Sequence, residues 1–298
     1  MTASNMPLQA KSADSIRREI ADLVQQYAEI AYAPSVFLPG ASAVPPSGKL
    51  MGAQELKYMV EASLDGWLTT GRFNAEFEKK LAAFIGIKYL ITVNSGSSAN
   101  LVAFNTLTSP KLGERSIQKG DEVIVPAVSW STTYFPLQQY GLKVKFVDID
   151  KETLNFDFRA LEEAVSERTR AILSVNLLGN SNDFKAIQKL IEDKEIIHIL
   201  DNCESMGSRF EDRYTGEYVL MSTYSTFFSH HISTMEGGMV TTNDEAMYHT
   251  LKSIRAHGWT RDLPDKNFVF DKTGATWDDM FRFVLPGYNL RPLEIEAA

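Results

Sequence analysis

The sequence predicts an α/β domain with a mixed, mostly parallel sheet that carries helices on both faces. Two observations lead to this class. Short apolar runs of strand length recur between residues 89 and 242, and helical stretches separate most of them. Such alternation is typical of β-α-β units, whose strands lie parallel. In sheets of this kind, ligands bind beside the carboxyl ends of the strands.

The region before the first strand is expected to be helical, with an irregular arm. Residues 14–32 place apolar side chains at helical spacing with charges between them, which predicts an amphipathic helix. Residues 34–48 are rich in Pro, Gly and Ser and predict an extended arm. Two more helices are expected over 53–66 and 73–85, separated by the loop LTTGR.

The remaining elements follow from the alternating pattern. The expected strands are 89–93, 121–126, 143–150, 170–179, 196–203, 222–228 and 237–242. The expected helices between them are 95–107, 131–140, 159–166 and 184–193. Polar and glycine-containing motifs follow several of these strands, so they should gather at one edge of the sheet.

Composition excludes several classes of function. The formal net charge of −8 offers no broad basic surface to a nucleic acid. The single cysteine, Cys203, forms no intrachain disulfide and cannot by itself hold an iron–sulfur cluster or a cysteine-based zinc site. No apolar run approaches the roughly 18 residues of a membrane span, and the first residues lack the apolar stretch of a signal peptide. We therefore expect a cytoplasmic protein that binds neither nucleic acid nor membrane.

The stretch NSGSSAN (94–100) directly follows the strand at 89–93. Gly96 allows a tight turn, and Ser97 with the first amides of the next helix can present free N–H groups to a phosphate. An ordinary serine N-cap explains the same residues equally well.

Two further residues stand where strands end. Asp201 closes the apolar run of ILDNCE and would be a half-buried carboxylate, suited to a protonated ring nitrogen or to a plain loop cap. Trp130 follows the strand at 121–126 and would either stack on a planar ring or pack in the core.

The stretch STFFSHHISTMEGGMV (225–240) contains adjacent histidines, His230 and His231, before Glu236-Gly237-Gly238. A metal site, a catalytic base and a packed strand end are the three interpretations. Neighbouring strand residues point to opposite faces, and no third ligand is near, so we reject the metal and expect a structural role for His231.

The order of these signals resembles one known arrangement. Pyridoxal-phosphate enzymes of the aspartate-aminotransferase fold (fold type I) carry, in this order, a phosphate-binding turn, an aromatic side chain that stacks on the ring, a strand-end Asp and a reactive residue. From Lys49 to Ala298 the chain resembles the DegT/DnrJ/EryC1/StrS sugar aminotransferase family. The matching motifs are KGDEVIVPAVSWSTTYFPLQQYGLKVKFVDID, SVNLLGN, DNCESMG, FSHHISTMEGG, RAHGWTR and FVLPGYNLRPLE.

The chain departs from this family at one position. A cofactor-binding lysine stands six residues before the Glu of the E-G-G turn in the family, and here that position is His230. The same departure is found in the dehydratase branch of the family. Imidazole cannot hold the cofactor covalently, but it can still move protons.

The resemblance implies an enzyme that removes the C3 hydroxyl of a nucleotide-linked 4-keto-6-deoxyhexose in deoxysugar and O-antigen biosynthesis. The expected cofactor is pyridoxal or pyridoxamine 5'-phosphate, with glutamate as amino donor, and the expected substrate is GDP-4-keto-6-deoxy-D-mannose. FLPG…VPPSGK and LDGWLTTGRF resemble the CDP-linked enzymes more, so CDP-4-keto-6-deoxyglucose is an alternative substrate. Residues 257–288 lack the cysteines of the CDP type, and no iron–sulfur cluster is expected. A sugar aminotransferase of the same family or a catalytically silent sugar-nucleotide binder would carry many of the same motifs.

The resemblance also implies a role for each matching residue. His230 would be the base, Asp201 would hold the ring-nitrogen proton, and Glu204 would lie near the ring hydroxyl. The other expected cofactor contacts are Gly96, Ser97 and Ser225 at the phosphate, Trp130 on the ring, and Asn289 at the phosphate of the neighbouring subunit of a homodimer. The expected substrate contacts are His257, Trp259, Arg261 and Arg291, for which a plain polar loop is the alternative.

Three parts of the chain are expected. Residues 1–48 would form the N-terminal helix and arm, 49–255 the cofactor-binding large domain, and 256–298 a substrate loop with the start of the segment leading to a small C-terminal domain. Because relatives continue further, most of that small domain is expected to be missing here.

Overall fold

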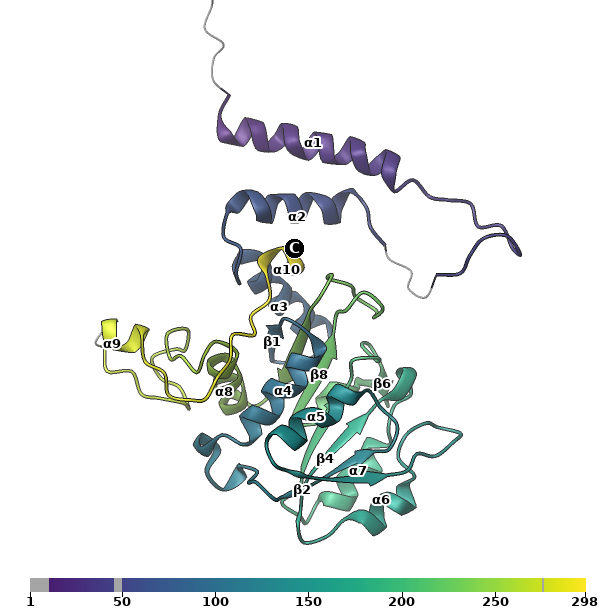
Figure 1. The fold of residues 1–298 in the computed structure, drawn as a ribbon, viewed down its shortest axis with the longest axis vertical. Helices are drawn as coiled ribbons and strands as arrows, with labels where there is room; N and C mark the ends of the chain where they lie inside the picture. Colours follow the sequence, from purple (N-terminus) through teal and green to yellow (C-terminus); the bar gives the residue numbers. More distant parts are fainter. Residues whose placement is uncertain (1–10, 46–49, 275) are drawn as a thin grey trace, which may run out of the picture.

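The computed structural model describes residues 11–45, 50–274 and 276–298 and centres on one seven-stranded sheet (Figure 1). Its strands are β1 (Tyr89–Val93), β2 (Glu122–Pro126), β3 (Lys143–Val147), β4 (Thr169–Val175), β5 (Ile197–Asp201), β8 (Met221–Ser225) and β9 (Gly238–Thr242). Their spatial order is β1-β9-β8-β5-β4-β2-β3. A short hairpin of β6 (Arg209–Phe210) and β7 (Arg213–Tyr214) lies apart from this sheet.

The sheet is mixed and mostly parallel, which confirms the predicted class. The pairs β8–β5, β5–β4, β4–β2 and β2–β3 are parallel. Strand β9 is antiparallel to both of its neighbours, β8 and β1, so β1 runs in the same direction as β8. The carboxyl ends of β1, β2, β4, β5 and β8 therefore meet at one edge, together with the start of β9.

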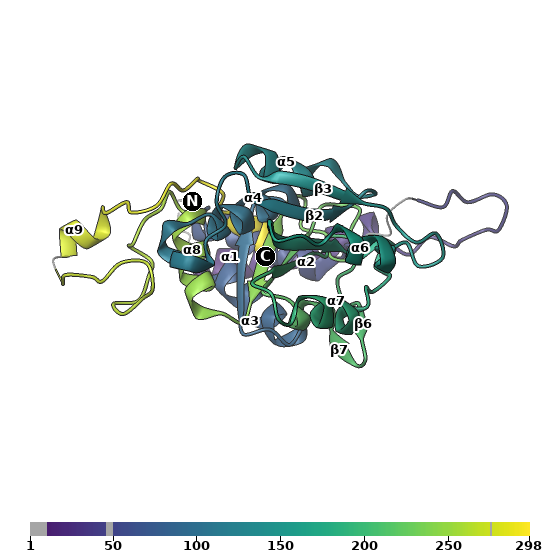
Figure 2. The same ribbon diagram turned by 90° about the horizontal axis from the view of Figure 1, so that it is seen from below.

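Helices cover both faces of the sheet. They are α1 (Ala13–Ala31), α2 (Ala53–Asp65), α3 (Arg72–Phe84), α4 (Gly96–Leu107), α5 (Ser131–Gln139), α6 (Phe158–Ala164), α7 (Phe184–Ile191), α8 (Glu245–Arg255), α9 (Thr276–Met280) and α10 (Glu294–Ala297). Short 3-10 turns occupy Pro110–Arg115, Leu177–Gly179 and Thr215–Tyr218. Figure 2 shows α5 on one side of the sheet and α3 and α7 on the other.

Alternating side chains of the strands build separate cores on the two faces. On one face, Phe104 of α4 and Leu251 of α8 pack with Val240 of β9. On the other face, Leu81 of α3 joins Tyr224 and Met239, and a third cluster packs α6 and α7 against β2 and β4. Because β2, β8 and β9 are buried along their whole length, the sheet is a rigid platform for residues at its edge.

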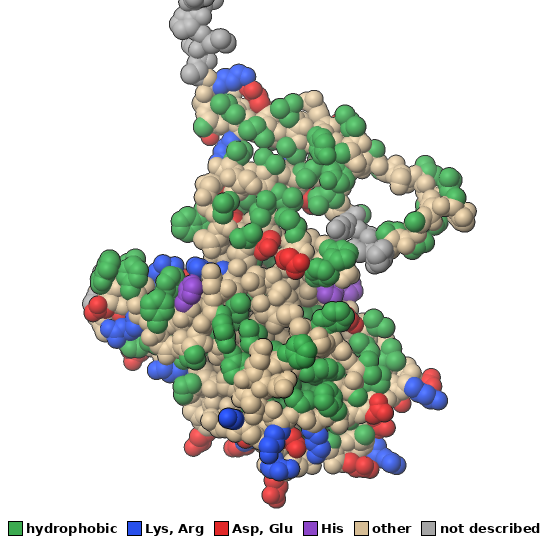
Figure 3. All heavy atoms as spheres, viewed as in Figure 1, with side chains coloured by type: hydrophobic (Ala, Val, Ile, Leu, Met, Phe, Trp, Pro, Cys, Tyr) green, Lys and Arg blue, Asp and Glu red, His purple; other side chains and the backbone are tan. Residues whose placement is uncertain are grey.

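The N-terminal helix α1 packs mainly on α2, and the pair stands off from the sheet (Figure 1). Its predicted amphipathic pattern is confirmed, and Ile20 and Val24 face Leu56 and Val60 of α2. Figure 3 shows hydrophobic side chains gathered over α1 and α2. Several large apolar groups remain exposed there, among them Leu23, Tyr27 and Ile30.

A distant carboxylate caps the start of α3. The N-cap residue, Gly71, has no side chain to cap the helix. Glu294 of α10 instead accepts the backbone N–H groups of Gly71 and Phe73, both at 2.6 Å, and of Asn74 at 3.2 Å. A helix N-terminus is a favourable site for negative charge, so this buried glutamate holds α10 against α3.

The structure corrects several predicted boundaries. Four strands end earlier than predicted, at Val147, Val175, Asp201 and Ser225, because the chain leaves the sheet there and turns along its edge. Helix α8 was not predicted, although Met247, Leu251 and Ile254 have helical spacing and Asp244 caps its first turn. Part of the predicted arm, residues 46–48, lies outside the described residues.

Candidate active site

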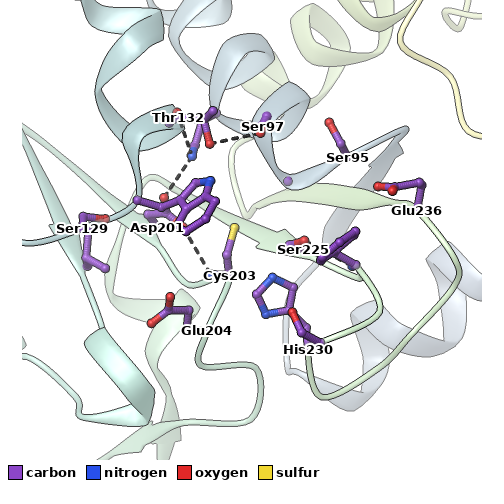
Figure 4. A pocket seen from close by; sticks show the side chains of 16 residues that line it. Ser95, Ser97, Ser129, Thr132, Asp201, Cys203, Glu204, Ser225, His230 and Glu236 are labelled. Atoms are coloured by element: carbon purple, nitrogen blue, oxygen red, sulfur yellow. Dashed lines mark hydrogen bonds between the residues drawn. The ribbon is translucent and has the colours of Figure 1, made fainter. Parts of the chain in front are cut away.

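A cavity of about 380 Å³ opens at the edge where the strand ends meet (Figure 4). Seven of the residues singled out in the sequence line it: Gly96, Ser97, Trp130, Asp201, Glu204, Ser225 and His230. They come from the ends of β1, β2, β5 and β8 and the loops that follow. The sheet direction thus brings together residues that are far apart in the chain.

The N-terminus of α4 forms one wall of this cavity. Ser95 caps the helix, and its Oγ accepts the N–H of Ser98 at 3.0 Å. The N–H groups of Gly96 and Ser97 belong to the first turn, where a helix leaves its donors without intrahelical partners. Free N–H groups and the positive end of the helix dipole make this wall a site for an anion.

Two glycines allow that helix end to approach the strands. A side chain on Gly96 would place its Cβ 2.6 Å from the Cβ of Ser225, at the end of β8. A side chain on Gly238, the first residue of β9, would overlap the carbonyl oxygen of Ser95. The hydroxyl of Ser225 therefore lies beside the start of α4. The structure confirms the serine N-cap, which is Ser95, and a phosphate site at the first amides of the helix stays a prediction.

Asp201 lies at the base of the cavity and is buried, with 5% of its surface exposed. Its Oδ2 accepts hydrogen bonds from Asn100 Nδ2 at 2.9 Å and Thr133 Oγ1 at 2.8 Å. Its Oδ1 accepts the N–H of Cys203 at 3.2 Å. A carboxylate oxygen can accept more than one hydrogen bond, so Asp201 can accept a further donor from the cavity.

His230 lies on the loop 226–237 between β8 and β9. Thr226 Oγ1 and Thr234 Oγ1 lie 2.6 Å apart at the base of this loop, and Thr226 also donates its N–H to Gly237 O. At the tip, His230 donates its N–H to Phe227 O at 2.9 Å. Figure 4 shows the imidazole directed into the cavity, on the same side as Ser225.

The prediction that His231 lies in a strand was wrong. Strand β8 ends at Ser225 and β9 begins at Gly238, so both histidines are in a loop and strand alternation does not separate them. His231 is exposed, whereas His230 is half-buried. Across the described ranges, no group of three or more His, Cys, Asp or Glu side chains is arranged to hold a metal ion.

The surroundings of His230 favour its neutral form. Burial lowers the pKa of the His230 imidazole below its ordinary value, and nearby His231 lowers it further. The carboxylates of Glu204 and Asp201 oppose this shift without reversing it. His230 is therefore an uncharged proton acceptor at neutral pH.

Trp130 and Glu204 stand at the mouth of the cavity. Trp130 precedes α5 as its N-cap residue, and 72% of its surface is exposed, which excludes the alternative of core packing. Glu204 accepts the N–H of Leu178 at 3.3 Å. Burial, with Asp201 and Glu204 nearby, raises the pKa of the Cys203 thiol, which keeps this lining residue a neutral thiol.

The other singled-out residues form a second group outside this cavity. Arg261 lies over the ring of Trp259, 4.2 Å from its centroid, and His257 packs against the same ring at 4.9 Å. Arg291 donates from Nε to Asn289 Oδ1 at 3.3 Å. The cavity described above is not lined by any residue of this second group, which consists of His257, Trp259, Arg261, Asn289 and Arg291.

Several lining residues had escaped the sequence analysis. These lining residues are Asn100, Ser129 and Thr132, and Thr133 binds Asp201 from just outside the cavity. Glu236, noted in the sequence as the first residue of the E-G-G turn, lines the cavity too. Asn100 stands four residues after Gly96, on the same side of α4, and this spacing was the available signal.

The donor set fits a flat ring that carries a phosphate. The α4 amides and Ser225 offer neutral donors to an anion, Trp130 offers an open aromatic face, and Asp201 offers an acceptor to a ring N–H. Lysine is not among the residues that line the cavity, so the described chain offers no amine for covalent attachment there.

A family model, the DegT/DnrJ/EryC1/StrS aminotransferase family, matches residues 49–298. GDP-4-keto-6-deoxy-D-mannose 3-dehydratase of Yersinia pseudotuberculosis is 56% identical over 231 residues, which are 77% of this chain and 58% of that protein. Lipopolysaccharide biosynthesis protein RfbH of Salmonella typhimurium is 41% identical over 96% of this chain and 68% of its own length.

A solved structure of GDP-4-keto-6-deoxymannose-3-dehydratase with a trapped PLP-glutamate geminal diamine has the same fold. It matches with a TM-score of 0.83 and 49% identity, over 86% of this chain and 66% of that one. The chain thus spans about three fifths of the first of these relatives, the Yersinia enzyme.

Proposed function

The chain belongs to the DegT/DnrJ/EryC1/StrS aminotransferase family, and on that premise we propose that it is a pyridoxamine-phosphate-dependent lyase. The proposed reaction removes the C3 hydroxyl of GDP-4-keto-6-deoxy-D-mannose in deoxysugar and lipopolysaccharide biosynthesis, with glutamate as amino donor. One observation carries the proposal: His230, and no lysine, faces the cavity beside Asp201 and Ser225.

The two ends of the cavity would hold the two ends of the cofactor. The amides of Gly96 and Ser97 and the hydroxyl of Ser225 would bind its phosphate. Trp130 would stack on the ring, and Glu204 would lie near the ring hydroxyl. Asp201 would accept the ring N–H and keep that nitrogen protonated. When bound, the cofactor supplies a ring that takes up electron density as the C–O bond breaks.

His230 would perform the proton transfer. Its imidazole is neutral at neutral pH, because burial lowers its pKa, so it can accept a proton from the carbon next to the cofactor amine. It cannot attach the cofactor covalently, as a lysine would. The substitution thus favours loss of a hydroxyl over delivery of an amine.

The test is turnover with defined substrates. The protein is incubated with pyridoxal phosphate, glutamate and either GDP-4-keto-6-deoxymannose or CDP-4-keto-6-deoxyglucose, and the products are identified by mass spectrometry. Ammonia and a 3-deoxy-4-keto sugar from the GDP substrate support the proposal. A stable 4-amino sugar would identify an aminotransferase instead. Turnover of the CDP-linked substrate alone would show that the substrate carries CDP and not GDP.

We also propose a cytoplasmic homodimer in which Asn289 reaches the cofactor phosphate of the partner. Asn289 is exposed and lies outside its own cavity, which supports this assignment. In this view, residues 49–255 bind the cofactor, and His257, Arg261 and Arg291 contact the substrate. No helix within the described ranges is long and apolar enough to cross a membrane.

Mixing two inactive variants tests the shared site. Asn289→Ala and His230→Asn each disable a site, but a hybrid dimer would restore one intact site. Recovery of activity on mixing supports the shared site, and no recovery in a proven dimer contradicts it.

A further inference from the structure

Asn100 is buried between Asp201 and the interior of the sheet. It lies on α4, with 2% of its surface exposed. Its Nδ2 donates to Asp201 Oδ2 at 2.9 Å and lies 3.4 Å from Thr132 O, and its Oδ1 accepts from Thr223 Oγ1 at 2.7 Å. The amide thus links α4, β5 and β8 under the cavity, and each of its polar atoms has a partner.

These partners determine which way the amide faces. The Thr223 hydroxyl has one hydrogen, and it gives that hydrogen to Asn100 Oδ1. Turning the amide over would place its oxygen against Asp201 Oδ2, and two acceptors at that distance repel each other. The observed orientation therefore matches an ionised Asp201.

A second chain of donors ends on the same carboxylate oxygen. Thr133 gives its hydroxyl hydrogen to Asp201 Oδ2, so the 2.9 Å contact between Ser129 Oγ and Thr133 Oγ1 must be donated by Ser129. Hydrogen bonds in such a chain strengthen one another. Thr133 is fully buried, which keeps water from replacing it.

The two oxygens of Asp201 are consequently unequal. Oδ2 receives two side-chain donors, whereas the backbone hydrogen bond to Oδ1, from Cys203, is longer, and the neutral thiol of Cys203 also contacts this carboxylate as a weak donor. A carboxylate oxygen has room for about two donors. The remaining acceptor capacity lies on Oδ1.

We propose that Asn100 is a positioning residue: together with Thr133 it saturates Oδ2 of Asp201 and reserves Oδ1 for the ring nitrogen of the cofactor. This rests on the proposed cofactor function. Asn100 does not touch the reacting atoms. It stabilises the ionised, correctly rotated Asp201, and the ring nitrogen keeps its proton as a result.

The test compares Asn100→Leu with a matched control on the same helix. Asn105 is also buried on α4, with 3% exposed, but its Nδ2 donates at 2.9 Å to Pro286 O, away from Asp201. Asn105→Leu therefore removes a buried amide of the same size without changing the Asp201 contacts. Thr223→Val removes only the hydroxyl that orients Asn100, and it serves if Asn100→Leu does not fold.

Two readouts are independent of turnover. The first is the 15N resonance of the pyridine nitrogen in labelled pyridoxal phosphate bound to the full chain. The second is the cofactor Kd from quenching of tryptophan fluorescence. We expect a protonated resonance in the wild type and in Asn105→Leu. In Asn100→Leu we expect a shift towards the unprotonated resonance and a Kd raised about tenfold, as for loss of a hydrogen bond to a charged group.

Three results would overturn the inference, and they are distinguishable. An unchanged resonance and Kd in folded Asn100→Leu, or in folded Thr223→Val if that variant has to serve, would refute the positioning role and leave the proposed function standing. A wild-type protein that binds no pyridoxal phosphate would refute the proposed function and the inference together. An equal resonance shift in Asn105→Leu would show a general loss of packing and would also refute the specific role.

Discussion

The two residues that face each other across the cavity are held in opposite ways. Asp201 is the last residue of a buried strand, and every donor around it comes from the core. His230 lies at the tip of a loop that Thr226 and Thr234 join at its base, and its own N–H is donated within the loop, to Phe227 O. The fixed carboxylate would set the electronic state of a bound ring, and the loop would present the base. The difference suggests that this fold can change its reaction by changing the loop while leaving the strand edge intact.

The largest effect should come from removing the base. We expect His230→Asn to lower kcat for dehydration about 10²- to 10⁴-fold, because general-base catalysis contributes about that much. Cofactor Kd should stay near the wild-type value, because Asp201 and the α4 amides are untouched. Stopped-flow turnover and fluorescence titration measure the two quantities. Unchanged turnover in this variant, or in His230→Lys, would contradict the assigned role.

A smaller effect is expected at the sheet edge, where the start of α4 packs closely against the end of β8. Gly96→Ala would push the start of α4 away from Ser225, since the added Cβ would lie 2.6 Å from the Ser225 Cβ. Overpacking of this kind costs about 1–3 kcal/mol, and phosphate affinity should fall with it. Urea unfolding measures the loss of stability, and titration with pyridoxal phosphate measures the loss of affinity. Gly52→Ala, outside the cavity, should leave cofactor affinity unchanged, and an equal loss there would contradict the local explanation.

Acid should act differently on the two regions. His198 is buried on β5, three residues before Asp201, and burial lowers the pKa of its imidazole to about 3. Below the ordinary pKa of about 6.5 the unfolded chain binds a proton that the folded chain does not, so stability falls as pH falls from there. We expect this residue to remove about 2 kcal/mol from the free energy of unfolding between pH 6.5 and 5.

A variant isolates this contribution from other titrating groups. His198→Gln should lose less stability than the wild type when urea unfolding is compared at pH 7.5 and pH 5. Equal losses in the two proteins would show that His198 does not cause the acid sensitivity. His230, whose pKa burial also lowers, should act on stability in the same direction and should in addition lose activity as it gains a proton.

The smallest effect concerns the base of the loop. Thr226→Val removes the hydroxyl that lies 2.6 Å from Thr234 Oγ1, and we expect a loss of about 1 kcal/mol of stability. Because only the loop is loosened, kcat should fall several-fold while cofactor Kd stays constant. Thr242→Val, which removes a hydroxyl bond to Leu220 O at the far end of the sheet, is the control. A change in cofactor Kd without a change in kcat would contradict the view that the sheet edge binds the cofactor and the loop serves catalysis.

The sequence was most informative where residues end strands. Alternating apolar runs predicted the sheet, and Asp201, which closes one of these runs, lines the cavity. Ser225 also lines it, but its place in the site came from the family resemblance, because its strand was expected to continue to residue 228. Asn100 could not be recognised, because a single asparagine inside a helix has the same pattern whether it faces a carboxylate or a core. The loop around His230 was misjudged for a related reason: its apolar residues, Phe227 and Phe228, resemble a continued strand.

The capping of α3 by Glu294 has a consequence for the growing chain. The capped amide of Gly71 and its carboxylate are 223 residues apart in sequence. On the ribosome, α3 emerges with an open N-terminus and remains uncapped until every strand of the seven-stranded sheet has been made. The start of α3 can therefore be capped only after the last strand has been synthesised. A chain released before residue 294 would leave the three amides that Glu294 accepts without this partner.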